Sequence, residues 1–306
     1  MRGHTSYVRG VAHLPDGRRI ITCSEDTSLR LWDRESGAQI GSNWQDDGHR
    51  APVLTIALSP NGKAIASGSS DGMVKLWDIE MKKVSTKWTG HTDGVTSVCW
   101  SADCIRVVSG SWDGTVRVWE MESGETVLGP IRTQGVNAVA YSPDSSNIAT
   151  GGGKAIEIWD TTTGERLSTL EQDSPVYCLA WTSDQKKLIA GFENGSIRIF
   201  NATTWEEIAI LEGHGEYVNA FSLQNDRLLA SVSWDRTARL WNLDTNLPVG
   251  PPLQHQHWVW DAAFSAGGKF LVVACEDKNA YVWNTHTMLQ ETGLEDLLLL
   301  PNVSIC

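Results

Sequence analysis

Short runs of alternating apolar and polar residues fill most of the chain, and this alternation is typical of half-buried β-strands. The stretch from Gly90 to Glu120 shows it most clearly. Its expected strands and tight hairpin turn are, in chain order, Val95–Trp100, Arg106–Gly110, Asp113-Gly114 and Thr115–Trp119. A weaker fourth strand is expected near Thr126–Ile131. Helical periodicity is absent until the end of the chain, so the pattern predicts units of four short strands.

The same unit recurs seven times at a nearly fixed step. Each copy closes its third strand with an aromatic residue followed by a polar one. These pairs are Trp32-Asp33, Trp77-Asp78, Trp119-Glu120, Trp159-Asp160, Phe200-Asn201, Trp241-Asn242 and Trp283-Asn284. Successive pairs lie 40 to 45 residues apart, and a histidine precedes five of them by 27 or 28 residues. A spacing this regular indicates a repeat architecture.

A four-stranded antiparallel unit of about 42 residues cannot bury both of its faces alone, so neighbouring units must stack on it. Radial stacking around a central channel leaves few open sheet edges. We therefore predict an all-β fold, a seven-bladed β-propeller of four-stranded antiparallel blades, as a single domain over residues 1–306. The repeats cover about residues 3–294 and leave a short tail at 295–306.

Composition narrows the classes of partner. The formal net charge of −12 and the pI near 5.1 disfavour nucleic acid and anionic membrane surfaces, because both are bound through Lys and Arg. The six cysteines form no C-x-x-C pair and are interpreted as reduced thiols. The chain also lacks an apolar run of signal-peptide or membrane-helix length. These features favour a cytoplasmic protein, with the nucleus as an alternative, and the three sequons at Asn194, Asn201 and Asn302 are interpreted as coincidences.

Three recurring motifs carry a resemblance to a known family. They are Gly-His at the entry of a unit, Ser-x-x-x-Asp at its second hairpin and Trp-Asp at the end of its third strand. The chain resembles the WD-repeat (WD40) β-propeller family over about residues 3–284. Its simple repeats also resemble the propellers of fungal repeat proteins and of NACHT-type signalling NTPases. No GxxxxGK[ST] phosphate loop is present, so the sequence lacks the NTPase part.

The resemblance implies a hydrogen-bonded relay of four side chains in each blade. The complete structural tetrads are His4, Thr22, Asp26, Trp32; His49, Ser67, Asp71, Trp77; His91, Ser109, Asp113, Trp119; and His214, Ser231, Asp235, Trp241. The seventh unit keeps His255, Asp277 and Trp283 but has Val273 in place of the hydroxyl. In the fourth and fifth units Arg132 and Gln172 replace the histidine, and Gly153 and Asn194 replace the aspartate. We expect these two blades to be the least rigid.

Ser, His and Asp within one unit also suggest a catalytic triad, but the same three types recur in equivalent places, and repetition favours architecture over chemistry. We predict no catalytic, cofactor-binding or metal-binding residues. His255 and His257 are the only close histidine pair, and His255 belongs to the repeat pattern. His13 aligns with apolar and aromatic residues of the other units, so we expect it to be a packing residue.

The resemblance implies that partners dock on the face where the entry loops and second hairpins emerge. On that face Tyr7, Tyr217, Trp234 and Trp258 fall on blades six, seven and one, which adjoin once the ring closes. The full set of predicted partner-binding residues is Tyr7, Arg50, Trp112, Tyr217, Trp234, Trp258, Glu25 and Glu276. The glutamates, with Glu216, favour a protein or peptide partner with basic residues. Alternatively, these aromatic residues only cover loops.

The closure of the ring is less clear from the sequence. The chain starts two residues before its first Gly-His, too late to lend a strand to the last blade, which must form its own from about Thr287 to Leu294 or remain without one. Met288, Leu289, Leu297 and Leu298 could instead line one side of a short helix. An open edge could recruit a strand from another chain, or the tail could fold back over it. A monomer is expected.

Three classes of function remain. The sequence favours a non-catalytic protein–protein interaction scaffold. A ligand-sensing WD-repeat module of a larger NACHT-type signalling protein is the alternative, and an upstream nucleotide-binding domain in the full gene would distinguish it. A propeller-based hydrolase is disfavoured, because no isolated acid, base or nucleophile breaks the repeat pattern.

Overall fold

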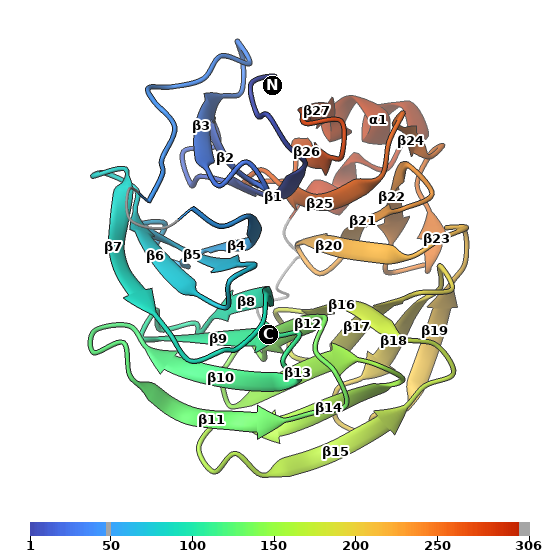
Figure 1. Cartoon of the computed structure of the whole chain (residues 1–306). Helices are drawn as coiled ribbons and strands as arrows, with labels where there is room; N and C mark the ends of the chain where they lie inside the picture. The colour runs from blue at the N-terminus through green and yellow to red at the C-terminus, as the bar shows by residue number, and fades with distance from the viewer. Residues whose placement is uncertain (47–49, 300–306) are drawn as a thin grey trace, which may run out of the picture.

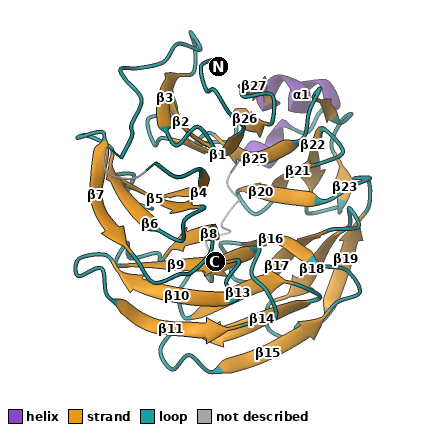
Figure 2. Cartoon of the chain, viewed as in Figure 1, coloured by secondary structure: helices purple, strands orange, loops and turns teal. Residues whose placement is uncertain are grey.

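Seven antiparallel sheets, one for each repeat, surround a central channel in the computed structural model, which describes residues 1–46 and 50–299 (Figure 1). The innermost strands of neighbouring blades lie side by side all round the ring, and the last blade contacts the first through strands β25 and β1. The predicted all-β, seven-bladed propeller is confirmed. Strands make up nearly all of its regular structure, and the helix lies at the end of the chain (Figure 2).

The strands of each blade follow one another in chain order. Blade one holds β1 (Val8–His13), β2 (Arg19–Ser24) and β3 (Leu29–Asp33). Blade two holds β4 (Val53–Leu58), β5 (Ala64–Ser69), β6 (Val74–Asp78) and β7 (Lys83–Trp88). Blade three holds β8 (Val95–Trp100), β9 (Arg106–Ser111), β10 (Thr115–Glu120) and β11 (Thr126–Arg132). Blade four holds β12 (Ala138–Tyr141), β13 (Asn147–Gly152), β14 (Ala155–Asp160) and β15 (Arg166–Glu171).

The remaining three blades continue this order. Blade five holds β16 (Val176–Trp181), β17 (Lys187–Phe192), β18 (Ile197–Asn201) and β19 (Glu207–Leu211). Blade six holds β20 (Val218–Gln224), β21 (Leu228–Ser233) and β22 (Thr237–Asn242), with a split outer strand of β23 (Leu247–Pro248) and β24 (Leu253–Gln254). Blade seven holds β25 (Val259–Phe264), β26 (Phe270–Cys275) and β27 (Ala280–Asn284). The chain continues into α1 (Thr285–Thr292) and the short 3-10 helix η1 (Glu295–Leu298).

The apolar cores lie between blades rather than inside them. Each of the seven clusters of buried apolar residues found in the described ranges joins two neighbouring blades. The cluster that closes the ring, for example, packs Val8 and Trp32 of blade one against Val272 and Ala280 of blade seven. Burial of these side chains therefore requires the neighbouring sheet, which is the physical reason why the repeats assemble into a ring.

Within the described residues, the last blade has three strands and no fourth. Of the two alternatives for Thr287 to Leu294, a strand or none, the structure has no strand, because most of this segment is the helix α1. Asn284 caps the start of the helix by accepting from the Thr287 amide, and Gly293 ends it in the left-handed conformation with φ 67°. Leu289 is fully buried in the cluster between blades six and seven. Packing and caps favour the helix, whereas Gly293 and the weak β-propensity of the segment disfavour a strand.

The start of the chain contacts the open edge of blade seven. The Met1 ammonium donates to Ala280 O at 2.8 Å, the Ala280 amide donates to Met1 O at 3.2 Å, and Arg2 pairs with Asn279. In blade two, Trp88 occupies the matching place beside Val74. The first residue therefore stands where the outer strand of a complete blade ends, although it forms no strand itself.

Candidate functional site

Three of the predicted tetrads form complete relays. In blade three the indole Nε1 of Trp119 donates to Ser109 Oγ at 2.7 Å, and Ser109 Oγ lies 2.8 Å from His91 Nε2. His91 Nδ1 lies 3.0 Å from Asp113 Oδ2. Since the carboxylate can only accept a hydrogen bond, His91 carries a proton on Nδ1. The relays of His4 and His214 have the same connections, with all distances between 2.7 and 2.8 Å.

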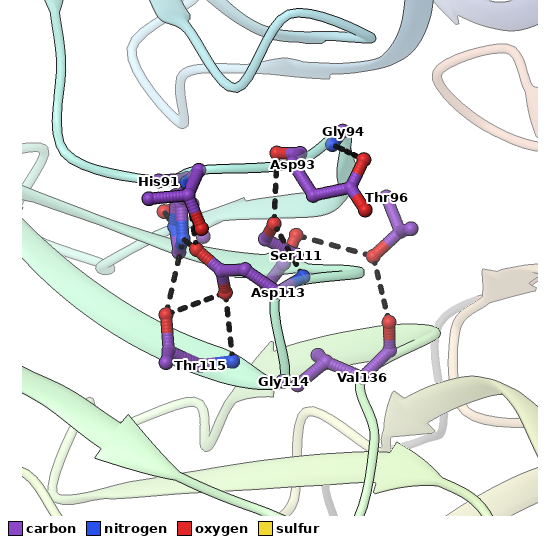
Figure 3. Close-up of polar contacts among 12 residues, drawn as sticks. His91, Asp93, Gly94, Thr96, Ser111, Asp113, Gly114, Thr115 and Val136 are labelled. Atoms are coloured by element: carbon purple, nitrogen blue, oxygen red, sulfur yellow. Dashed lines mark hydrogen bonds and ion pairs between the residues drawn. The ribbon is translucent and has the colours of Figure 1, made fainter.

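The aspartate of the relay also organises the hairpin around it, as the close-up of blade three shows (Figure 3). Asp113 Oδ1 accepts from the hydroxyl of Thr115 at 2.7 Å, and its other oxygen accepts from the Thr92 amide at 3.0 Å. Burial alone would raise the pKa of Asp113, but these hydrogen bonds and that of His91 bring it down to about 2. Burial lowers the pKa of His91 and outweighs the opposite effect of Asp113.

Blades four, five and seven depart from this pattern, and blade two shows its tryptophan-to-serine half within the described residues. In blade two Trp77 Nε1 donates to Ser67 Oγ at 2.8 Å, whereas His49 lies outside the described residues. In blade four Trp159 Nε1 donates to Thr150 Oγ1 at 3.1 Å. In blade five Arg198 contacts Gln172, at the position of the missing histidine, at 3.2 Å and the next residue, Asp173, at 2.6 Å. Blades four and five therefore lack the histidine-to-aspartate half of the relay.

In blade seven the missing hydroxyl leaves two buried nitrogen atoms without a hydrogen bond in the described part of the chain. His255 Nε2 and Trp283 Nε1 are buried and have no hydrogen-bond partner within residues 1–46 and 50–299, as expected from Val273. Asp277 accepts instead from the Tyr281 hydroxyl. His255 packs edge-on against Tyr281 and Trp283, with centroid distances of 5.2 and 5.7 Å.

The relay serines are poorly placed for nucleophilic attack. Ser67, Ser109 and Ser231 are 0% exposed, and each accepts a hydrogen bond from an indole. A triad nucleophile must instead be reachable by its substrate. The geometry therefore favours a structural role for the relays. His13 is buried at the end of β1, in agreement with its predicted packing role.

A continuous set of stacked rings crosses blades five, six and seven on the face of the entry loops. We define this aromatic array as Tyr177, Tyr217, Trp234, Trp258 and Trp260. Successive ring centroids along Tyr177, Tyr217, Trp234 and Trp258 are 4.9, 4.5 and 4.6 Å apart. The last two rings are nearly parallel, at 6°, and Trp260 meets Trp234 edge-on at 5.4 Å. Such rings present a large apolar surface with polar edges, which is common at protein interfaces.

The structure brings together three of the predicted partner-binding residues, Tyr217, Trp234 and Trp258. It extends them toward blade five rather than toward blade one, and among the described residues Tyr7 makes no ring contact with the array. Tyr7 is nevertheless 37% exposed and Trp112, in blade three, is 58% exposed. Arg50 is exposed as well.

Sequence reasoning missed Tyr177 and Trp260, which both follow a valine at the start of an inner strand. The strand pairing shifts there, between Val176 and Cys178 and between Val259 and Asp261, so each residue is the extra one in a β-bulge. A bulge redirects the side chain of the extra residue. Both side chains consequently line the channel. An aromatic residue after the first strand valine is the sequence signal that could have identified them.

The acidic residues of the site are partly neutralised by the protein itself. Glu25 Oε1 accepts from Arg9 Nε at 2.7 Å, and the Arg9 guanidinium lies 3.7 Å from the centroid of the Trp260 ring. The predicted negative charge of Glu25 is therefore already paired. Glu276 lies 3.9 Å from His257, and the Tyr217 hydroxyl donates to Glu193 at 3.0 Å. Glu216 remains exposed beside the array.

Three residues of the array, Tyr177, Trp234 and Trp260, line the central channel. The channel encloses a cavity of about 1010 Å³, lined by the inner strands and by residues such as Trp112, Tyr177, Trp234, Trp260 and Asp261. The described residues contain no group of three or more His, Cys, Asp or Glu side chains placed to hold a metal ion. Nor do the described segments include a helix that is long and apolar enough to span a bilayer.

Comparisons with known proteins agree with this architecture. A family model described as the IFT122 first beta-propeller matches residues 76–296, and the WD domain, G-beta repeat matches residues 1–33 and 42–78. The Periodic tryptophan protein 2 homolog of Dictyostelium discoideum is 29% identical over 212 residues, which cover 53% of this chain and 23% of that protein.

Two further relatives carry cell-cycle names. The B-type cell cycle switch protein ccs52B of Medicago truncatula is 28% identical over 40% of this chain and 26% of its own length. The APC/C activator protein CDH1 of Saccharomyces cerevisiae is 30% identical over 35% of this chain and 20% of its own length. The aligned region thus covers about a quarter or less of these relatives. Since the IFT122 model spans most of the chain and the WD model recognises its first repeats, the chain belongs to the WD-repeat β-propeller family.

Proposed function

We propose that the chain is a non-catalytic protein–protein interaction scaffold that docks a protein or peptide on the loop face of the propeller, at the aromatic array. Its relatives include proteins named as an APC/C activator and as a subunit of the anaphase-promoting complex, names that describe membership of protein assemblies. Fold alone does not imply function, so the proposal rests on the site.

The observation that carries the proposal is the stack of Tyr217, Trp234 and Trp258 on one sector of the ring. Trp258 keeps 38% of its surface exposed although its ring lies against Trp234. Exposed tryptophan and tyrosine side chains that neighbours already hold in place lose little conformational entropy on binding. The array is therefore a preorganised apolar surface with one face open to a partner.

Charge indicates the chemistry of that partner. The net charge of −12 and the exposed Glu216 favour basic residues on the docked segment, combined with an apolar or aromatic residue for the array. The same charge disfavours nucleic acid and anionic membranes as partners. We further propose a cytoplasmic or nuclear location and a monomeric chain. A mass by light scattering that rises with concentration would overturn the monomer.

The experiment that tests the docking site replaces Trp234 and Trp258 together by alanine. Affinity capture followed by mass spectrometry should lose the partners that the wild-type chain retains, while the melting temperature stays close to wild type. Leu247→Ala is the matched control, since Leu247 is an apolar residue of the outer rim with 61% exposure. Unchanged capture by the double variant would rule out this site.

A further inference from the structure

One residue of the channel wall breaks the repeat. The inner-strand residue at one register, opposite the fifth residue of the second strand, is uncharged in six blades, where it is Gly10, Thr55, Ser97, Ala138, Cys178 or Ala220. In blade seven it is Asp261, opposite Ala274. Features that recur in every blade are those that the fold requires. A charge that occurs in one blade alone is therefore not explained by the fold.

Asp261 accepts a hydrogen bond from the neighbouring blade, and this role does not require a charged side chain. Its Oδ2 accepts from the Val11 amide of blade one at 2.9 Å, which links the first and last blades. Ser97 performs the same duty between blades three and four, where its hydroxyl accepts from the Val139 amide at 3.1 Å. The second oxygen of Asp261 accepts from the Ala262 amide at 2.8 Å. A neutral hydroxyl therefore suffices for the link, and the negative charge is additional to it.

No cation of the protein compensates that charge. Within residues 1–46 and 50–299, Asp261 forms no ion pair, and Arg9, which also lines the channel, is paired with Glu25. The ionisable groups that interact with Asp261 are the buried thiols of Cys23 on β2 and Cys178 on β16. A carboxylate without a counter-ion in such surroundings is costly, and a bound cation would remove that cost.

The cavity supplies donors as well. The indole nitrogens of Trp234 and Trp260 are buried, and neither has a hydrogen-bond acceptor among the described residues. Both residues line the same cavity of about 1010 Å³ as Asp261. Indole nitrogens only donate, so the group that complements this site carries an acceptor oxygen together with a positive charge. A lysine or arginine residue in a peptide has both, in its side chain and its backbone carbonyl.

We propose that Asp261 anchors the side-chain cation of one lysine or arginine residue of the docked partner, with a carbonyl oxygen of the partner accepting from Trp260 or Trp234. This inference rests on the proposed docking function and names the part of the partner that enters the channel. Desolvation by burial raises the pKa of Asp261 to about 7. Binding of a cation favours the ionised carboxylate, so the affinity increases as the pH rises through neutrality.

The test uses acetylated, amidated tripeptides with lysine, arginine or norleucine between two alanines, titrated into the full chain by calorimetry. The two cationic peptides should bind, and Asp261→Ser, which copies blade three, should weaken them by about tenfold or more. The rise of affinity as the pH passes through neutrality should also disappear in this variant. Asp226→Asn is the matched control, because Asp226 lines the same cavity but bonds to Ser183 at 2.7 Å, and it should bind like wild type.

Three results would overturn the proposal: equal binding by Asp261→Ser, equal binding of the norleucine peptide, or no binding of either cationic peptide to the wild-type chain. Asp261→Asn, checked by circular dichroism, replaces the serine variant if that protein does not fold. Docking at the aromatic array is tested separately from the role of Asp261. Suppose that the double variant of Trp234 and Trp258 to alanine no longer captures partners, whereas Asp261→Ser binds the tripeptides like wild type. This result would support the docking function and refute the role of Asp261 as an anchor. The reverse result would refute docking at the aromatic array and support the role of Asp261 as an anchor.

Discussion

The indole Nε1 of Trp119 donates a hydrogen bond of 2.7 Å to the hydroxyl of Ser109, and through that hydroxyl the ring is joined to His91. Trp119 is 2% exposed and Ser109 is fully buried. The relay thus connects the third strand of the blade to its second strand and to the entry loop. The stability of the blade depends on every member keeping its partner.

Ser109→Ala should consequently destabilise the fold. The substitution leaves the Trp119 indole and the His91 Nε2 buried without a partner, which costs about 1 to 3 kcal/mol. The midpoint of urea denaturation measures the effect. Ser123→Ala, in an exposed turn, serves as the control and should stay within about 0.5 kcal/mol of wild type. Equal midpoints for both variants would show that the relay contributes nothing to stability.

The relay histidine His91 should make the fold sensitive to acid. Burial lowers the pKa of His91, so the unfolded chain binds a proton more readily than the fold does. The stability due to His91 is therefore present above the ordinary pKa of about 6.5 and is lost as the pH falls below it. His91→Gln should lose less stability than wild type between about pH 7 and about pH 5. The exposed His257→Gln should behave like wild type, and an identical pH slope in all three proteins would contradict this account.

Asp261 should give the stability of the fold the opposite pH dependence. Its pKa is raised to about 7 by burial, so the folded chain holds this proton more tightly than the unfolded chain. Its contribution to stability declines as the pH rises from the ordinary value of about 4 through about 7. Asp261→Ser keeps an acceptor for Val11 and removes the charge. Its midpoint of urea denaturation relative to wild type should therefore be higher at about pH 8 than at about pH 5. A difference that is the same at both pH values would refute the assignment.

Amide hydrogen exchange should be fastest in blades four and five, across residues 130 to 200. These blades lack the histidine and the aspartate of the relay, and in blade five Arg198 forms a partly exposed ion pair with Asp173. Local opening there breaks fewer buried hydrogen bonds than in blade three or six. Mass spectrometry of exchanged peptides measures the difference. Uniform protection around the ring would contradict it.

The repeat period was sufficient to predict the number of blades and their β-strands, because these follow from positions that recur in register, and the family resemblance implied the relays. Features that depend on single residues were harder. Tyr177 and Trp260 join the array only because a bulge directs each of them into the channel. The pairing of Glu25 with Arg9 likewise depends on a contact between side chains that no periodic pattern encodes.

The end of the chain illustrates the same limit. Residues 285–292 form a helix because Leu289 fills a gap between two blades and because Asn284 and Gly293 cap it. From the sequence, strand and helix were nearly balanced, and the deciding contacts come from blades six and seven. Asp261 gives a different lesson, since comparing the seven repeats position by position would have shown its charge without any coordinates.

Site-directed photo-crosslinking tests the docking claim most directly. A photoreactive phenylalanine analogue is placed at position 258, within the aromatic array, or at position 247 on the outer rim, and the chain is irradiated with its captured partner. We predict crosslinks from position 258 that disappear when Trp234 is replaced by alanine, and none from position 247. Crosslinks from position 247 alone would show that partners bind the outer rim of the propeller and not the aromatic array.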